Sequence, residues 1–176
     1  MRLATAIVLA AAAAAAQAQH QPYAGQQQRD LKALSADEVK QYLEGAGLGY
    51  ARPAELNHYP GPSHVLELAE QLALSREQRS EIQRLGDSHH AEARSIGAQL
   101  VRAEHNLEML FRRGKIVETE LAEALRTAAV LQGEYRMSHL ETHRRVRAML
   151  TDEQVARYDA LRGYAAHSDT AHHRRN

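Results

Sequence analysis

Two long segments with apolar residues at alternating spacings of three and four constrain the fold of this chain more than any other feature. The first runs from Ser75 to Phe111 and its series is Ile82, Leu85, His89, Ala93, Ile96, Leu100, Ala103, Leu107 and Leu110. The second series is Leu121, Leu125, Ala128, Gln132, Tyr135, His139, Thr142, Val146 and Met149. Polar residues interrupt both series, His89 in the first and Gln132, His139 and Thr142 in the second. Such spacing lines one face of an α-helix that packs against another helix. The intervening Arg112-Arg113-Gly114-Lys115 predicts a turn, so residues 75–149 should form a long antiparallel helical hairpin.

The turn sets the pairing of the two predicted helices. If Leu110 faces Leu121, the same register places Ile82 opposite Met149. The relative levels of five glycine and histidine positions follow from this register. His89 falls opposite Thr142, between His139 and His143, while Gly97 and Gly133 come level, where we expect the two backbones to approach closely.

Shorter helices are predicted on both sides of the hairpin. Start signals occur at Ser35-Ala36-Asp37-Glu38 and after the rigid turn at residues 59–62, where residues 64–72 have helical periodicity. A hydroxyl and a Gln three residues later form a capping box in both Leu74-Ser75-Arg76-Glu77-Gln78 and Leu150-Thr151-Asp152-Glu153-Gln154. No strand-like alternation occurs, so the fold class is all-α. A thin hairpin buries little surface on its own, so we expect a homodimer.

The N-terminus has the pattern of an export signal. Met1-Arg2 precedes an apolar run at residues 3–16 and an Ala16-Gln17-Ala18 cleavage pattern, and the run is too short to span a membrane. We therefore predict a signal peptide at residues 1–18, cut near Ala18. Composition then divides the rest into a flexible leader at 19–33, a single helical domain at 34–164 and a disordered His-rich tail at 165–176.

Composition excludes several function classes. The chain has no cysteine, which rules out disulfides and thiolate chemistry, and its 22 basic and 22 acidic residues create no general field for nucleic acid. There is no Gly-rich phosphate loop and no nucleophile elbow. In the segment His-Leu-Glu-Thr-His, Glu141 lies about 200° around the helix from His139, which differs from the zinc-protease order. We therefore do not expect an enzyme.

Eleven histidines are the unusual feature of the composition. His139 and His143 are four residues apart on one helix face, and the predicted register brings His89 to the same level. Imidazole binds Zn, Cu, Ni and Co, so these three residues form a candidate metal site, with His64 as a further ligand. The alternative is that the histidines stack on aromatic rings or form hydrogen bonds within the hairpin. No cofactor is required by either interpretation.

The two capping boxes carry a family resemblance. An exported, cysteine-free helical chain with Leu-Ser-Arg-Glu-Gln at 74–78 and Leu-Thr-Asp-Glu-Gln at 150–154 resembles the LTxxQ family of periplasmic proteins, over roughly residues 64–162. The first motif has Ser in place of Thr. That family includes the Spy and CpxP stress proteins and the metal-associated ZraP and CnrX. Residues 54–69 also look like a Spy/CpxP-type or heavy-metal-sensor-like subgroup.

The resemblance implies a periplasmic chaperone that acts without ATP, or a heavy-metal sensor of the ZraP/CnrX type. Its partners would be unfolded or misfolded envelope proteins, or a membrane-bound regulator. Spy-like members hold clients through mixed basic and apolar contacts. The candidate client-binding residues here are Arg136, Arg144, Arg145 and Arg147. The alternative for these arginines is a solvated helix face near a C-terminus, where cations suit the helix dipole.

Overall fold

The computed structural model describes residues 23–164, and within that range every regular element is a helix, which confirms the predicted all-α class. The predicted signal peptide, its cleavage near Ala18 and the His-rich tail lie outside the described residues. The chain divides into two units, Met1–Ser35 and Ala36–Asn176. The described part of the first contains one short 3-10 helix, η1 (Gln26–Gln28). Helices α2 to α7 belong to the second unit.

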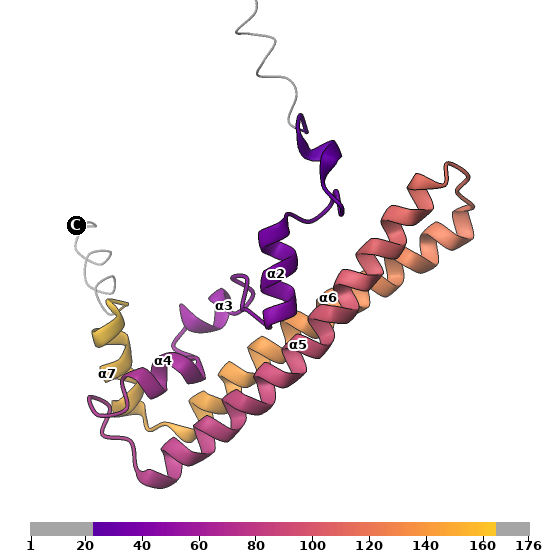
Figure 1. Ribbon diagram of the computed structural model, residues 1–176. Coiled ribbons are helices and arrows are strands. Elements are labelled where there is room, and N and C mark those ends of the chain that lie inside the picture. The colour runs from indigo at the N-terminus through magenta and orange to yellow at the C-terminus, as the bar shows by residue number, and fades with distance from the viewer. Residues whose placement is uncertain (1–22, 165–176) are drawn as a thin grey trace, which may run out of the picture. The chain divides into compact units, whose positions relative to one another are not determined.

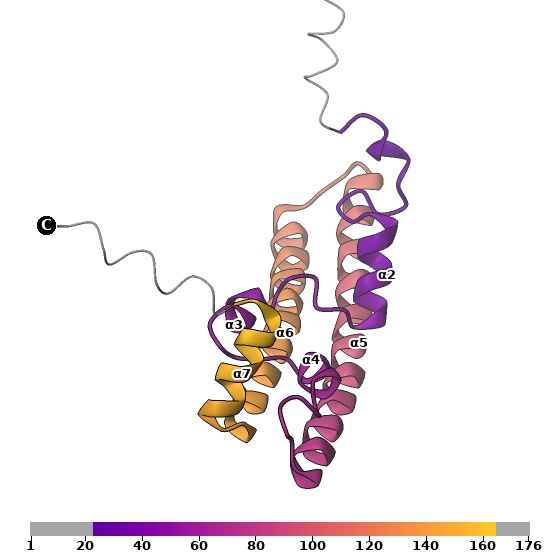
Figure 2. The same cartoon turned by 90° about the vertical axis from the view of Figure 1, so that its left-hand side faces the viewer.

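Two antiparallel helices form the predicted long hairpin of the second unit (Figure 1). They are α5 (Arg76–Arg112) and α6 (Glu118–Met149), joined by a turn in which Gly114 has a φ of 70°. The shorter helices are α2 (Ala36–Glu44), α3 (Arg52–Glu55), α4 (Pro62–Glu67) and α7 (Asp152–Arg162). Figure 2 shows α4 and α7 at the end of the hairpin away from its turn, and α2 beside α5.

The helix predicted at residues 64–72 has different bounds in the structure. α4 begins two residues earlier, because Pro62 lacks an N–H and its fixed φ suits the first helical position. It ends at Glu67, and the chain continues in turns to Leu74, where the amide of Leu74 donates to the carbonyl of Ala69 over 3.0 Å. Ala73 has a φ of 50° in this turn, a conformation that ends a helix.

Both capping boxes form as predicted. Ser75 Oγ accepts from the Gln78 amide over 3.1 Å, and Thr151 Oγ1 accepts from the Gln154 amide over 3.2 Å. Each Gln side chain returns a bond to the backbone N–H of its cap residue. The two Gln side chains also bond each other, with Nε2 to Oε1 distances of 2.9 and 3.1 Å. We name this contact the glutamine clasp.

The main apolar core lies next to the glutamine clasp. It joins α4 and the following turns to α5, α6 and α7, and its fully buried members include Val65, Ile82, Val146 and Tyr158. Leu150 and Val155, which flank the second capping box, are both buried in this core, as in a hydrophobic staple. The core therefore holds the short helices against the open end of the hairpin.

Two residues of the predicted α6 series are exposed near the hairpin turn. Leu125 is 49% exposed and Gln132 is also exposed, whereas Ala128, Tyr135, Thr142 and Val146 are buried. A series with a period of 3.5 drifts by about 20° per heptad around a helix with 3.6 residues per turn. Over the distance from His139 to Leu125 this drift turns the predicted positions outward.

The predicted close approach of Gly97 to Gly133 was wrong. A Cβ atom on Gly97 would lie 2.1 Å from the carbonyl oxygen of Tyr42, so the backbone that approaches Gly97 is that of α2. A Cβ atom on Gly133 would meet nothing within 4 Å. The register alone could not reveal this, because α2 comes from a segment outside the hairpin.

Substitution of the two glycines should therefore have opposite effects. We expect Gly97→Ala to lower the free energy of unfolding by about 1–3 kcal/mol, because the methyl group forces α2 away from α5. Gly133→Ala should raise it by about 1 kcal/mol through helix propensity. Urea denaturation followed by circular dichroism measures both. Equal stability of the two variants would contradict the close packing of α2.

Candidate functional site

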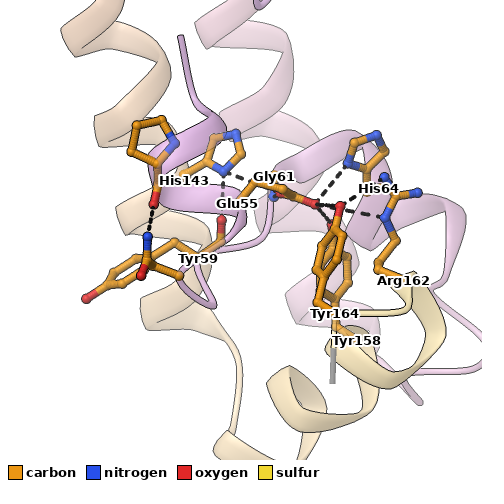
Figure 3. Close-up of polar contacts among 10 residues, drawn as sticks. Glu55, Tyr59, Gly61, His64, His143, Tyr158, Arg162 and Tyr164 are labelled. Atoms are coloured by element: carbon orange, nitrogen blue, oxygen red, sulfur yellow. Dashed lines mark hydrogen bonds and ion pairs between the residues drawn. The ribbon is translucent and has the colours of Figure 1, made fainter. Parts of the chain in front are cut away.

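A nearly buried carboxylate, that of Glu55 at the end of α3, connects four elements of the second unit (Figure 3). Its Oε1 accepts from the hydroxyls of Tyr158 and Tyr164, the latter over 3.2 Å, and its Oε2 accepts from the Gly61 amide over 3.2 Å. The side chain is 12% exposed. Burial and the neighbouring Glu55 carboxylate both raise the pKa of Tyr158, so its hydroxyl stays protonated and acts as a donor.

Three cationic or titratable side chains surround the same carboxylate. His64 Nδ1 lies 3.5 Å and Arg162 Nε 3.9 Å from Oε1, while His143 Nδ1 lies 3.7 Å from Oε2. These distances are longer than hydrogen bonds, so the contacts are electrostatic. Glu55 thus links two predicted metal ligands, His64 of α4 and His143 of α6, to helix α7.

His89 and His139 meet across the hairpin. His139 Nδ1 lies 2.6 Å from His89 Nε2, and the rings are edge to face with centroids 4.5 Å apart. His139 Nε2 lies 3.1 Å from the carbonyl oxygen of Ala46, in the loop after α2. The ring of Tyr135 packs edge to face on His139, and its hydroxyl donates to the same carbonyl over 2.6 Å.

The tautomers of this histidine pair follow from its partners. The Ala46 carbonyl can only accept, so His139 Nε2 carries a proton and its Nδ1 accepts from His89 Nε2. A neutral His89 then has an unprotonated Nδ1. That atom is buried and has no hydrogen-bond partner within residues 23–164. The pair therefore leaves one imidazole lone pair unused.

His143 does not join this pair. Its Nδ1 lies 2.7 Å from the carbonyl oxygen of Tyr59, which can only accept, so Nδ1 carries the proton. The imidazole also lies so close to Gly61 that a Cβ atom there would be 2.9 Å from His143 Nε2. The predicted inter-helix cluster is thus divided into a His89–His139 pair and a His143–Glu55 contact.

All four predicted metal ligands nevertheless line one cavity of about 640 Å³. His64, His89, His139 and His143 surround it together with His90, which the candidate set did not include. Asp87 and Glu44 contribute carboxylates to its wall. In the part of the chain that the structure describes, no three His, Asp or Glu side chains are placed to hold one metal ion together.

The predicted client-binding arginines have different surroundings. Arg144 forms two hydrogen bonds to Glu141, and Arg147 is half-buried and paired with Asp152 over 2.5 Å. Arg145 is exposed and lies close enough to Glu141 to contribute to the lowered pKa of that carboxyl, of which Arg144 is the main cause. Arg136 is exposed and has no acidic partner among residues 23–164.

Several residues of the site were not predicted from the sequence. Glu55 lies in a helix of only four residues, which leaves no periodic signal, although it falls within the segment 54–69 that resembles the metal-sensor-like subgroup. The Ala46 carbonyl is a backbone atom and has no residue-type signature. His58 Nδ1 lies 2.6 Å from Oδ2 of the buried Asp159, a contact between residues 101 positions apart.

The described fold places the protein in a class of small all-α proteins. Members of this class are antiparallel helical hairpins, and here two capping boxes close the open end of the hairpin. The family model described as LTXXQ motif family protein matches residues 62–162. This chain belongs to the LTXXQ motif family, since the match covers more than half of it. The comparisons with curated proteins and with solved structures gave no match.

Membership in the LTXXQ family supports a general role of the periplasmic Spy/CpxP type. Proteins of this type are non-enzymatic stress proteins. The family is periplasmic. None of the helices in the described range is long and apolar enough to cross a membrane.

The histidine pair should make stability depend on pH. Burial, and then the neighbouring His139, His143 and His90, lower the pKa of His89 to about 4, and burial also lowers that of His139. A depressed folded-state pKa means that the unfolded chain binds more protons between about pH 6.5 and 4. Stability contributed by neutral His89 is therefore full above pH 6.5 and is lost as the pH falls towards 4.

We expect His89 to account for about 1–2 kcal/mol of the loss between pH 7 and pH 4.5, after allowance for solvent screening of the half-buried ring. Urea denaturation in the presence of a chelator should show a smaller loss for His89→Gln, whose amide can still donate to His139. An identical loss of stability in the unaltered protein and in His89→Gln would contradict the role of His89 in this pH dependence.

Proposed function

We propose that this protein is an ATP-independent periplasmic chaperone or envelope-stress protein of the Spy/CpxP type, whose clients are unfolded or misfolded envelope proteins. The observation that carries the proposal is an exposed stripe on α6 in which two apolar side chains lie between two basic ones. Val130 and Met137 are 58% and 64% exposed, and Arg126 and Arg144 lie at the two ends of the stripe. Positions 130, 137 and 144 are seven residues apart and share one helix face.

Such a stripe suits an unfolded client. Burial of apolar surface yields roughly 25 cal/mol per Å², so exposed Val130 and Met137 favour contact with a client's apolar side chains. Met is flexible and adapts to varied partners. Further exposed apolar side chains, those of Phe111 and Val117, lie at the turn end of the hairpin. A membrane-bound regulator is the alternative partner, and a homodimer stays a prediction.

A direct test uses suppression of client aggregation. At low micromolar concentration the mature protein should reduce light scattering by a reduced or heat-unfolded client without ATP, equally with and without chelator. Val130→Asp/Met137→Asp should lower this activity severalfold, because it removes the apolar part of the stripe. Ala91→Asp/Ala156→Asp adds the same charge at exposed positions outside the stripe and should keep the activity. Absence of suppression by the unaltered protein would contradict the proposal.

The second candidate is a heavy-metal sensor or binding protein for Zn, Cu, Ni or Co, of the ZraP/CnrX type. The unused lone pair of His89 Nδ1 and the five histidines around one cavity favour it. A free imidazole nitrogen whose ring donates its other N–H to a fixed acceptor is the usual state of a metal-binding histidine. Simultaneous binding by His89, His139 and His143 requires the His89–His139 contact to open, because His139 Nδ1 accepts from His89 Nε2. The His143–Tyr59 contact can persist, since it leaves His143 Nε2 unprotonated.

Calorimetry on chelator-stripped, untagged protein tests this candidate. We expect stoichiometric binding of at least one of the four metals, weakened about tenfold or more by His139→Ala/His143→Ala. Binding should also weaken as the pH falls towards 4, where His89 becomes protonated, because the ligands must be neutral. His105→Ala is the control, since that exposed histidine lies on the half of α5 that leads to the hairpin turn. No heat of binding for any of the four metals would exclude the candidate.

A further inference from the structure

A second cavity, separate from the histidines, lies between the α3 region and α6. It has a volume of about 440 Å³, within the range of about 300–1,000 Å³ that ligand-binding pockets span. Its principal lining residues are Leu48, Tyr50, Arg52, Pro53, Leu56 and Arg136. We name this cavity the Arg52–Arg136 groove.

One part of the groove wall is apolar. Leu48, Pro53 and Leu56 contribute to it, and Leu56 is 55% exposed. Leu48 has a φ of 47°, a left-handed conformation that is unfavourable for a residue with a side chain. Together these side chains present apolar surface that a bound side chain could bury.

The charge in the groove is basic and uncompensated. Arg52 and Arg136 are both exposed, and neither guanidinium has a hydrogen bond or an ion pair within residues 23–164. No Asp or Glu side chain lines the groove. By contrast, Arg144 and Arg147 of the same helix α6 are paired with acidic side chains. A partner of the groove is therefore expected to supply the negative charge.

We propose that the Arg52–Arg136 groove binds extended segments of a client polypeptide in which an acidic side chain adjoins a large apolar one. This inference rests on the proposed chaperone function and names the class of segment recognised. A guanidinium binds a carboxylate through two parallel N–H bonds, which a neutral amide cannot match in strength. The apolar neighbour packs against Leu48, Pro53 and Leu56.

The test uses two fluorescein-labelled peptides with blocked termini, Gly-Ser-Leu-Glu-Leu-Glu-Ser-Gly and the same peptide with Gln in place of both Glu. Fluorescence anisotropy at low salt should show the Glu peptide binding about tenfold more tightly. Arg52→Gln/Arg136→Gln should abolish this preference. Arg102→Gln/Arg157→Gln, which changes two exposed arginines outside the groove, should retain it. Leu56→Ser should weaken binding of both peptides, with circular dichroism confirming that each variant is folded.

Two results would overturn the inference. One is equal affinity of the unaltered protein for the two peptides, and the other is a preference that survives in Arg52→Gln/Arg136→Gln. The proposed chaperone function fails separately, if the unaltered protein does not suppress client aggregation. Fluorescence anisotropy measures the peptide preference, and its loss in Arg52→Gln/Arg136→Gln, without the aggregation assay. The two proposals can therefore fail separately.

Discussion

The glutamine clasp between Gln78 and Gln154 is the interaction on which the rest of the fold depends. Each side-chain amide makes four hydrogen bonds, which is its full capacity. One bond is to its own cap residue and two are to the other glutamine. The fourth is to a backbone carbonyl, that of Met149 for Gln78 and that of Leu72 for Gln154. A net contribution of about 1 kcal/mol for each such bond is typical, and the loss of one amide would leave the other with unsatisfied groups. The clasp thus joins the start of α5, the end of α6, the start of α7 and the turns before α5, which lie far apart in the sequence.

This closure determines where the polar site lies. Because α7 starts at the clasp, its Tyr158 reaches the main core and donates to the Glu55 carboxylate. Glu55 in turn lies against His143 of α6, whose Nδ1 donates to the Tyr59 carbonyl. The family motif therefore has a structural role and contributes no ligand of its own. A change in the position of α7 would therefore move the Glu55 carboxylate, and with it the contact of Glu55 with His143 in the histidine cavity.

The sequence predicts those parts of the structure that depend on local patterns. The hairpin, its turn and both capping boxes follow from periodicity and from hydroxyl–glutamine spacing within a few residues. The clasp, the Glu55 contacts and the packing of α2 on Gly97 could not be predicted, because each pairs segments whose relative position only the folded chain determines. Leu125 marks an intermediate case, since its exposure follows from the drift of a 3.5-residue series around a straight helix. For the histidines, the sequence placed His89 and His139 on facing helices but could not show that His143 bonds the Tyr59 carbonyl.

A single backbone carbonyl controls the chemistry of the histidine pair. Ala46 follows Gly45, whose φ of 72° ends α2, and its oxygen accepts from both Tyr135 and His139. Accepting from His139 Nε2 fixes the tautomer of that ring, and this tautomer leaves the free lone pair on His89 Nδ1. The position of α2 depends in turn on Gly97, where no side chain larger than hydrogen fits beneath the Tyr42 carbonyl. The ability of His89 to accept a proton or a metal ion is therefore set by how α2 packs on the hairpin, although α2 contributes no histidine.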